Sequence, residues 1–242
     1  MRMLLTIETQ THQGDTMSIA MMLREGTADK HQETEKVPYL RAIFRGGLDT
    51  QTYTYQLESL RDVYKEMEEL FRTNSSDPIL SKVYFPELFR TKALEEDIKF
   101  FQSKFNAKLR GKVTAATQNY IDHIKRVAKE NPYLLVAQSY VRYLGDLSGG
   151  QAIKKVIAKT FSLEGADGVA FYEFPEIQDH QAFKGIYRTA MDTLPLSDAQ
   201  KTELVEESKK VFDLNKNLFV ELESDLKENI GAERFAALIP AG

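Results

Sequence analysis

Residues 140–151 read Tyr-Val-Arg-Tyr-Leu-Gly-Asp-Leu-Ser-Gly-Gly-Gln, which places Gly145, Gly149 and Gly150 inside a stretch of otherwise helical character. Glycine in a helix interior costs about 1 kcal/mol relative to alanine, so three glycines within six residues need a reason. Gly145 and Gly149 are four residues apart and would bare one strip of helix backbone. That strip suits either a turn between two tightly packed helices or a surface on which a flat ligand lies.

Two charged pairs at helical spacing have a similar double interpretation. Arg142 and Asp146 are four residues apart, and a surface ion pair of about 0.3–0.5 kcal/mol is the simplest account of them. Lys184 and Arg188 carry like charges at the same spacing, which is mildly unfavourable unless an anion lies between them. They are either two solvated side chains or a site for a carboxylate or phosphate.

The rest of the chain is dominated by helical periodicity. One apolar face recurs every three to four residues at Leu57, Leu60, Tyr64, Met67 and either Leu70 or Phe71. Asp49 or Thr50 is expected to cap this helix, and Ser76–Pro78 ends it. Further helices are predicted at Lys92–Phe105, Ala115–Lys129, Pro132–Leu147, Gln151–Thr160, Asp179–Thr193 and Ala199–Leu226, the last capped by Ser197, with a loop at Leu163–Pro175. We expect one all-α domain over residues 17–242, preceded by a disordered extension at 1–16, and Met17 is an alternative start.

The composition excludes several classes of protein. The chain has 242 residues, net charge −4, four histidines and no cysteine. The lack of cysteine excludes disulfides, iron–sulfur clusters and thiolate ligands, and fits a reducing compartment. The acidic balance gives no basic footprint for nucleic acid. No apolar run reaches the roughly 20 residues that a membrane span requires, and common nucleotide-binding and metallopeptidase motifs are missing.

His31 lies on a charged, helical stretch, with Glu35 four residues later on the same face. A carboxylate in that position can hold one ring nitrogen and leave the other for a metal. A solvated histidine on a surface helix is the more common case for such a pattern.

Taken together, these stretches resemble the haem oxygenase family. Residues 142–151 match the signature of the family's distal helix without a gap, and the run leading into His31, residues 83–88, Asn131–Pro132 and residues 183–188 agree in order and spacing. The resemblance extends over roughly residues 22–226. It implies a single helical domain in which haem lies between a proximal helix and a kinked distal helix.

The resemblance also implies roles for individual residues. His31 corresponds to the iron ligand and Glu35 to the carboxylate that supports it. Gly145 and Gly149 correspond to the kink of the distal helix, and Asp146 to the aspartate that anchors a water network beside bound O2. The other expected site residues are Arg142 and Tyr64 as partners of Asp146, Arg24, Tyr140, Lys184 and Arg188 at the haem propionates, and Phe212, Asn215 and Phe219 along the pocket.

The implied reaction is cleavage of haem, which is both substrate and cofactor, to biliverdin, CO and ferrous iron. It uses O2 and electrons from a reductase partner, and we expect the IXα isomer of biliverdin. Ferredoxin is the expected donor, with an NADPH-dependent reductase or a flavodoxin as alternatives. Lys154, Lys155 and Lys159 form a basic strip that would suit an acidic donor, or simply a solvated face. A monomer in the cytoplasm, or in the plastid stroma of an alga, is expected.

Three residues depart from the family pattern. Thr34 replaces the usual alanine, Gln138 replaces a frequent histidine, and Val141 replaces the usual threonine.

Two other functions compete with the oxygenase. A haem-transfer protein would keep His31 but would not need Asp146 and the glycine strip. A thiaminase-type hydrolase on a helical fold commonly needs a cysteine nucleophile, which this chain lacks.

Overall fold

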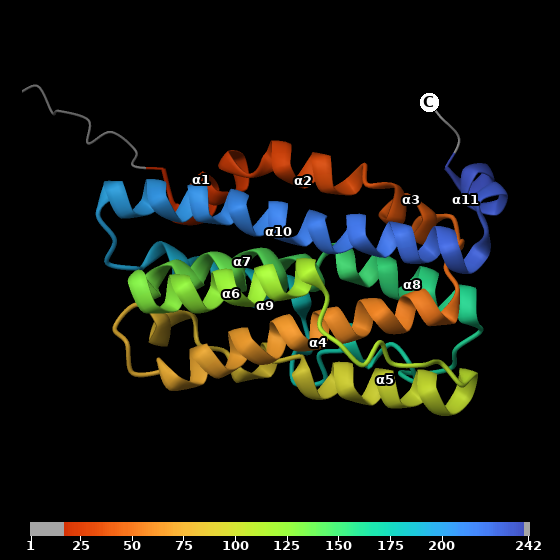
Figure 1. Cartoon of the computed structure of the whole chain (residues 1–242). Coiled ribbons are helices and arrows are strands. Elements are labelled where there is room, and N and C mark those ends of the chain that lie inside the picture. The colour runs from red at the N-terminus through yellow and green to blue at the C-terminus, as the bar shows by residue number, and fades with distance from the viewer. Residues whose placement is uncertain (1–16, 240–242) are drawn as a thin grey trace, which may run out of the picture.

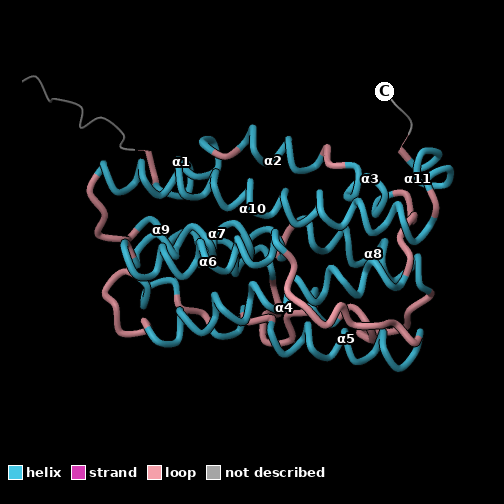
Figure 2. The backbone as a smooth tube through the Cα atoms, in the orientation of Figure 1, coloured by secondary structure: helices cyan, strands magenta, loops and turns pink. Residues whose placement is uncertain are grey.

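The computed structural model describes residues 17–239, which form α-helices and short 3-10 helices without any strand in that range (Figure 1, Figure 2). The predicted all-α, single-domain fold is confirmed. The extension predicted at residues 1–16 lies outside the described residues. The α-helices are α1 (Ile19–Gly26), α2 (Ala28–Glu35), α3 (Pro38–Phe44), α4 (Thr50–Thr73), α5 (Thr91–Phe105), α6 (Ala115–Glu130), α7 (Leu135–Asp146), α8 (Gly149–Phe161), α9 (His180–Asp192), α10 (Asp198–Ile230) and α11 (Ala232–Leu238). The 3-10 helices are η1 (Leu80–Val83), η2 (Pro86–Leu88), η3 (Pro132–Leu134) and η4 (Ala170–Tyr172).

The two longest helices, α4 and α10, form the frame of the molecule. Asp49 caps α4 by accepting hydrogen bonds from the backbone N–H groups of Gln51 and Thr52, both at 2.9 Å. Ser197 begins α10 with a complete capping box to Gln200. The predicted apolar face of α4, from Leu57 to Phe71, is buried, and α10 packs against α1, α2, α3, α4, α6 and α7. Figure 1 shows α10 running the length of the domain above α4 and α7.

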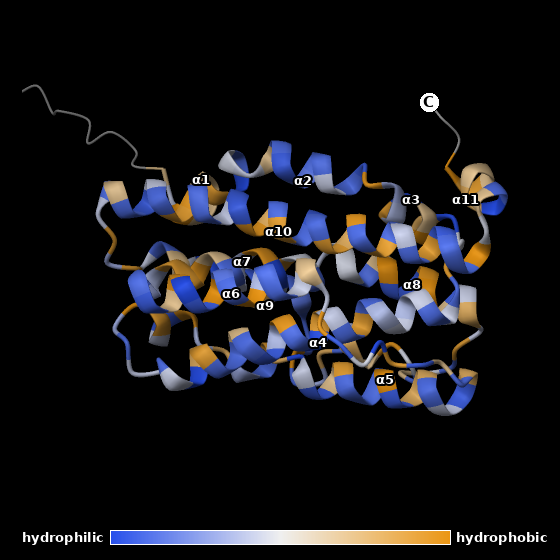
Figure 3. Ribbon diagram, in the orientation of Figure 1, coloured by the Kyte–Doolittle hydropathy of each residue, from blue (hydrophilic) through white to orange (hydrophobic). Residues whose placement is uncertain are grey.

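The buried apolar residues of these helices form one continuous core, whereas α2 is almost entirely hydrophilic (Figure 3). Thr34 is the one buried residue of α2. A helix of that kind is held by tertiary partners instead of by an apolar face of its own.

The structure corrects two predicted boundaries. The helix predicted over Pro132–Leu147 begins as the 3-10 turn η3, where the N–H of Leu134 bonds to the carbonyl of Asn131 at 2.9 Å, and continues as α7. The loop predicted at Leu163–Pro175 contains η4. Neither element has a periodic apolar pattern, because each is one turn long.

The glycine-rich stretch marks a break between α7 and α8. The N–H of Leu147 still bonds four residues back to Tyr143 at 2.9 Å, but that of Ser148 bonds three residues back to Gly145 at 3.1 Å. This local change of hydrogen bonding turns the chain, after which Gly149 begins α8. None of the helices within residues 17–239 is long and apolar enough to cross a lipid bilayer.

Candidate functional site

A cavity of about 580 Å³ lies among α1, α2, the α7–α8 break, η4 and α10. Ligand pockets of this size are typical for organic cofactors and drug-sized molecules. Every site residue expected from the sequence lines this cavity except Tyr64 and Lys184. The expected residues that line it are Arg24, His31, Glu35, Tyr140, Arg142, Gly145, Asp146, Gly149, Arg188, Phe212, Asn215 and Phe219.

On the side of α2, His31 is the exposed histidine of the cavity. Its Nδ1 lies 3.5 Å from Oε1 of Glu35, and the two side chains are 61% and 64% exposed. The Phe212 ring lies 5.9 Å from the His31 ring in an edge arrangement. Because Glu35 approaches Nδ1, the other nitrogen, Nε2, is the one that a metal would bind.

Four charged side chains attach α2 to α10. Lys30 Nζ lies 3.0 Å from Asp213 and 3.6 Å from Glu33, and Lys216 Nζ lies 2.9 Å from Glu33 and 3.7 Å from Asp213. Lys216 beside Glu33 lowers the pKa of that carboxyl group. This ring of alternating charges compensates for the lack of an apolar face on α2.

Asp146 and Arg142 belong to a buried network. The Tyr64 hydroxyl donates to Asp146 Oδ2, Arg142 Nε donates to the Tyr64 hydroxyl at 3.0 Å, and Arg142 also donates to Oδ1 of Asn215. Arg142 and Asp146 are 9% and 7% exposed, and Arg142 Nη2 lies 3.9 Å from Asp146 Oδ1. The surface ion pair that their spacing suggested is therefore wrong. Tyr64 does not line the cavity itself, but its hydroxyl bonds to both Asp146 and Arg142, which do.

Burial has a strong effect on the titration of this network. It raises the pKa of Asp146 to about 6, although Arg142 and Tyr64 act in the opposite direction. Burial also acts to lower the pKa of Arg142, but Tyr64 and Asp146 outweigh it, and the guanidinium stays charged. The result is a carboxylate held next to a fixed cation and a phenol, with a pKa close to neutral.

The two glycines of the break leave space at the cavity wall. A methyl group added at Gly145 or Gly149 would meet no atom within 4 Å. The interpretation as a tight helix contact is therefore wrong for these two positions. Gly150 differs, because a methyl group there would lie 3.3 Å from the Tyr172 ring. The backbone at Gly145 and Gly149 therefore borders the open cavity, whereas the backbone at Gly150 packs against the Tyr172 ring.

A basic cluster lies at one edge of the cavity. Burial lowers the pKa of Lys184, and neighbouring Arg188 lowers it further. Burial raises the pKa of Tyr140, and the positive charges of Arg188 and Arg24, which line the same cavity, act against that increase. Lys184 does not line the cavity, since its Nζ donates to Ser148 Oγ at 3.1 Å at the edge of the break. Within the described part of the chain, Arg24, Lys184 and Arg188 have no carboxylate partner within 4 Å.

Comparison with known proteins gives a consistent result. Residues 17–221 match the family model described as "Heme oxygenase". Heme oxygenase 1 of the cyanobacterium Synechocystis is 41% identical over 223 residues, covering 92% of each chain. Heme oxygenase of Guillardia theta is 39% identical, covering 85% of this chain and 86% of that one. The crystal structure of the Synechocystis enzyme in complex with heme superimposes with a TM-score of 0.85, 41% identity and coverage of 92% of this chain and 100% of that one.

The chain belongs to the haem oxygenase family. The family, the fold and the haem-cleaving activity expected from the sequence are confirmed.

The three departures from the family pattern have different surroundings. The hydroxyl of Thr34 donates to the carbonyl of Lys30 at 2.9 Å, one turn back on α2. Gln138 Nε2 donates to Glu207 Oε1 at 2.9 Å, and the same oxygen lies 2.6 Å from Nε2 of His123. Val141 is buried and lines the cavity. The amide of Gln138 thus occupies a polar position among α6, α7 and α10, away from the cavity.

Sequence reasoning missed several residues that shape the site. Phe171 and Tyr172 line the cavity from η4, and Ser148 and Gln151 contact the groups around the break. Gln151 ends the signature stretch and could have been examined for that reason. Nothing in residues 163–175 signalled that two aromatic residues return to the site.

Proposed function

We propose that haem enters this cavity with its iron bound by Nε2 of His31, and with the α7–α8 break covering the opposite face of the ring. The observation that carries the proposal is that His31 of α2 and Asp146 of α7 line the same cavity, whose wall at Gly145 and Gly149 carries no side chains. Haem supplies the iron at which O2 is reduced and the ring that is opened. Glu35 orients His31 through Nδ1.

The basic cluster fits the two propionates of haem. Arg24 and Arg188 are exposed and line the cavity together with Tyr140, and Lys184 donates a hydrogen bond to Ser148 at the break. Cations without carboxylate partners favour an anionic ligand, and carboxylates match guanidinium groups well. If both propionates are held in this way, the haem ring is fixed in a single in-plane orientation. That favours a single biliverdin isomer, the IXα form.

Asp146 is proposed to act through ordered water, positioned by Tyr64 and Arg142. Its carboxylate is held by the Tyr64 hydroxyl, and a pKa of about 6 lets it exchange protons near neutral pH. Arg142 keeps the network charged and connects it to Asn215 on α10. Phe212 and Phe219 of α10 supply apolar cavity wall.

We propose an acidic one-electron donor of the ferredoxin type, with a flavodoxin or an NADPH-dependent reductase as alternatives. Lys155 and Lys159 are exposed on α8, whereas Lys154 pairs with Glu173, so the basic strip is smaller than the sequence suggested. Comparing turnover with each donor, wild type against Lys155→Glu, tests this assignment. The monomeric state and the cytoplasmic or plastid location remain predictions, the first testable by size-exclusion chromatography with light scattering.

The decisive experiment is optical. Purified protein is titrated with ferric haem, and a reductant with O2 is then added while the Soret band and biliverdin absorbance are followed. The oxygenase should lose the band and form biliverdin, whereas a haem-transfer protein would keep it.

His31→Ala should abolish biliverdin formation. Added imidazole should restore part of it, because the basic cluster still holds the propionates of the ring. Normal turnover by this variant without imidazole would exclude His31 as the ligand. Asp29→Asn, a change at an exposed residue of the same helix that does not line the cavity, serves as the control.

A further inference from the structure

A buried carboxylate outside the cavity holds the element that closes one of its walls. Asp97 of α5 is fully buried, and its two oxygens accept the backbone N–H groups of Ala170 and Phe171, each at 2.8 Å. Burial raises the pKa of Asp97 to about 7, with smaller contributions from Glu96 and Asp167, although the two backbone N–H groups act in the opposite direction. A carboxylate bound only by backbone amides costs stability, but it fixes the position of the turn that it binds.

That turn is η4, and its aromatic residues reach the site. Phe171 and Tyr172 are each 2% exposed and line the cavity. The Phe171 ring lies 5.6 Å from the Tyr64 ring, edge to face, and Tyr64 is the hydrogen-bond partner of Asp146. A shift of η4 would therefore reach the Asp146 network through one aromatic contact.

Gln151 connects η4 to the α7–α8 break. Its Nε2 donates to the carbonyl of Tyr172 at 2.9 Å and to that of Asp146 at 3.3 Å. The second bond crosses the break, since Asp146 ends α7 and Gln151 lies in the first turn of α8. Gly150 lets the Tyr172 ring pack directly on the backbone beside this bond.

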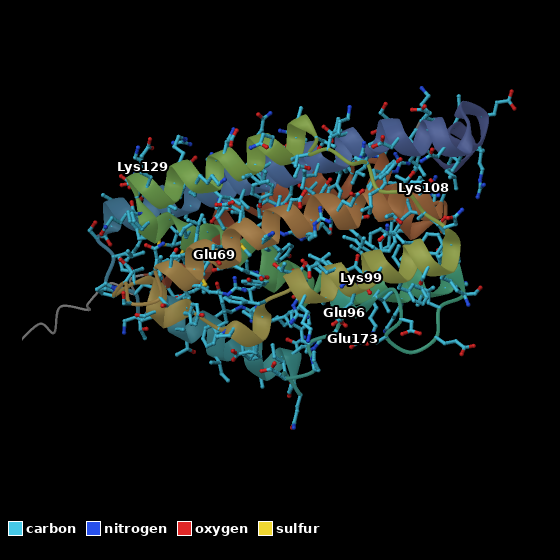
Figure 4. All side chains as sticks on the ribbon, turned by 60° about the horizontal axis from the view of Figure 1, so that its bottom comes forward. Glu69, Glu96, Lys99, Lys108, Lys129 and Glu173 are labelled. Atoms are coloured by element: carbon cyan, nitrogen blue, oxygen red, sulfur yellow. The ribbon has the colours of Figure 1, made fainter. Side chains whose placement is uncertain are left out.

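The far end of η4 is held independently. Arg90 donates to the carbonyl of Glu173, and its guanidinium lies 4.0 Å from the centre of the Phe174 ring. The element η4 packs against α5, and Figure 4 shows Glu173, directly after η4, on the same side of the molecule as Glu96 of α5. The segment is thus fixed from α5 at its start, from α8 in its middle and from Arg90 at its end.

We propose that Asp97 and Gln151 are positioning residues for ring opening: they brace the α7–α8 break through η4 and so set its position over the haem edge. The proposal rests on the proposed function, because it requires haem beneath the break. It requires that loosening η4 at Asp97 also loosens residues 145–151, because Gln151 joins η4 to the break.

The test uses Asp97→Asn and Gln151→Leu. The asparagine turns one acceptor into an N–H donor facing a backbone N–H, so one amide of η4 loses its partner. The leucine keeps the volume of Gln151 but removes both hydrogen bonds. Two variants serve as matched controls. Glu95→Gln neutralises an exposed carboxylate of α5, and Gln118→Leu replaces an exposed glutamine of α6.

The first measurement is amide hydrogen exchange of the haem-free protein. We expect exchange at residues 170–173 and also at 145–151 to accelerate about tenfold or more in both variants, with no change in the controls. Acceleration confined to 170–173 in Asp97→Asn would overturn the brace. If Asp97→Asn does not fold, Gln151→Leu still decides, since it must loosen both segments.

The second measurement is the isomer pattern of biliverdin, separated by chromatography, beside the haem dissociation constant. Both variants should bind haem within about threefold of wild type yet release a mixture of isomers, because only the alignment of the break changes. A single unchanged isomer would contradict the proposal. If even the wild type forms no biliverdin, the proposed function fails, whereas the exchange experiment still tests the brace.

Discussion

Replacing Asp146 by asparagine should make the haem-free protein more stable at neutral pH. The same change should strongly reduce the turnover of haem. The carboxyl group of Asp146 has a pKa of about 6 in the folded protein against an ordinary value of 3.8, because it is buried. A folded pKa above the unfolded one means that folding favours the protonated form. The ionised form at pH 7 therefore destabilises the protein, and asparagine is a neutral side chain of the same shape.

The magnitude follows from the two values. A difference of about two pKa units corresponds to about 3 kcal/mol, which is the upper limit of the gain in unfolding free energy. The attraction of Arg142 for the carboxylate is already contained in this value, and Tyr64 and Asn215 still bond to the guanidinium in the variant. The sign of the pH dependence is fixed. The gain is close to zero below about pH 4, grows as pH rises from about 4 to 6, and is constant above.

The assay is urea unfolding of haem-free wild type and Asp146→Asn at pH values from 4.5 to 8. Asp167→Asn, which removes an exposed carboxylate, is the control and should show no comparable gain. A variant that is less stable than wild type at pH 8, or a difference that does not change with pH, would refute the argument from burial. Turnover of the same variant should be strongly reduced, since a carboxamide cannot exchange protons near pH 7.

Three further predictions follow from the site. Lys184→Ala combined with Arg188→Ala should convert one biliverdin isomer into a mixture while leaving the His31-bound haem spectrum normal; an unchanged isomer with unchanged haem affinity would show that the pair is only solvated. Gly145→Ala should raise the unfolding free energy by up to about 1 kcal/mol, because the added methyl group meets no atom in the haem-free protein, but should slow turnover by intruding on the ring. Lys216→Met should weaken haem binding and reduce its sensitivity to salt, measured by Soret titration at two ionic strengths; equal salt dependence in both proteins would show that the ion pairs on α2 do not matter.

Local signals made most of the helices predictable. Asp49 and Ser197 cap helices because their side chains bond to the first free N–H groups, and this chemistry needs no tertiary contact. The apolar face from Leu57 to Phe71 likewise carries its own period. Single-turn elements such as η4 have no such period, so the loop predicted there was the only choice that the local sequence offered.

Burial was the property that the sequence could not supply. Arg142 and Asp146 are spaced like a surface pair, and only packing against α4 and α10 makes them an interior pair with a shifted pKa. Asp97 was overlooked for the same reason, because an acidic residue in the run Glu95-Glu96-Asp97 looks solvated until η4 is folded onto it. The family resemblance identified Asp146, but it did not single out the carboxylate at Asp97.

The two walls of the cavity are built from different interactions, and this difference has a consequence for access. The α7–α8 wall is tied by buried hydrogen bonds to Tyr64 and Asn215 and by a part-buried one from Gln151, and these must break if it moves. The α2 wall buries only Thr34 and is held by partly exposed ion pairs, which water and salt can replace. Segments with few buried apolar contacts open at the lowest free energy. A flat ring should therefore enter, and its opened product leave, by displacement of α2, while the wall that sets the chemistry stays in place.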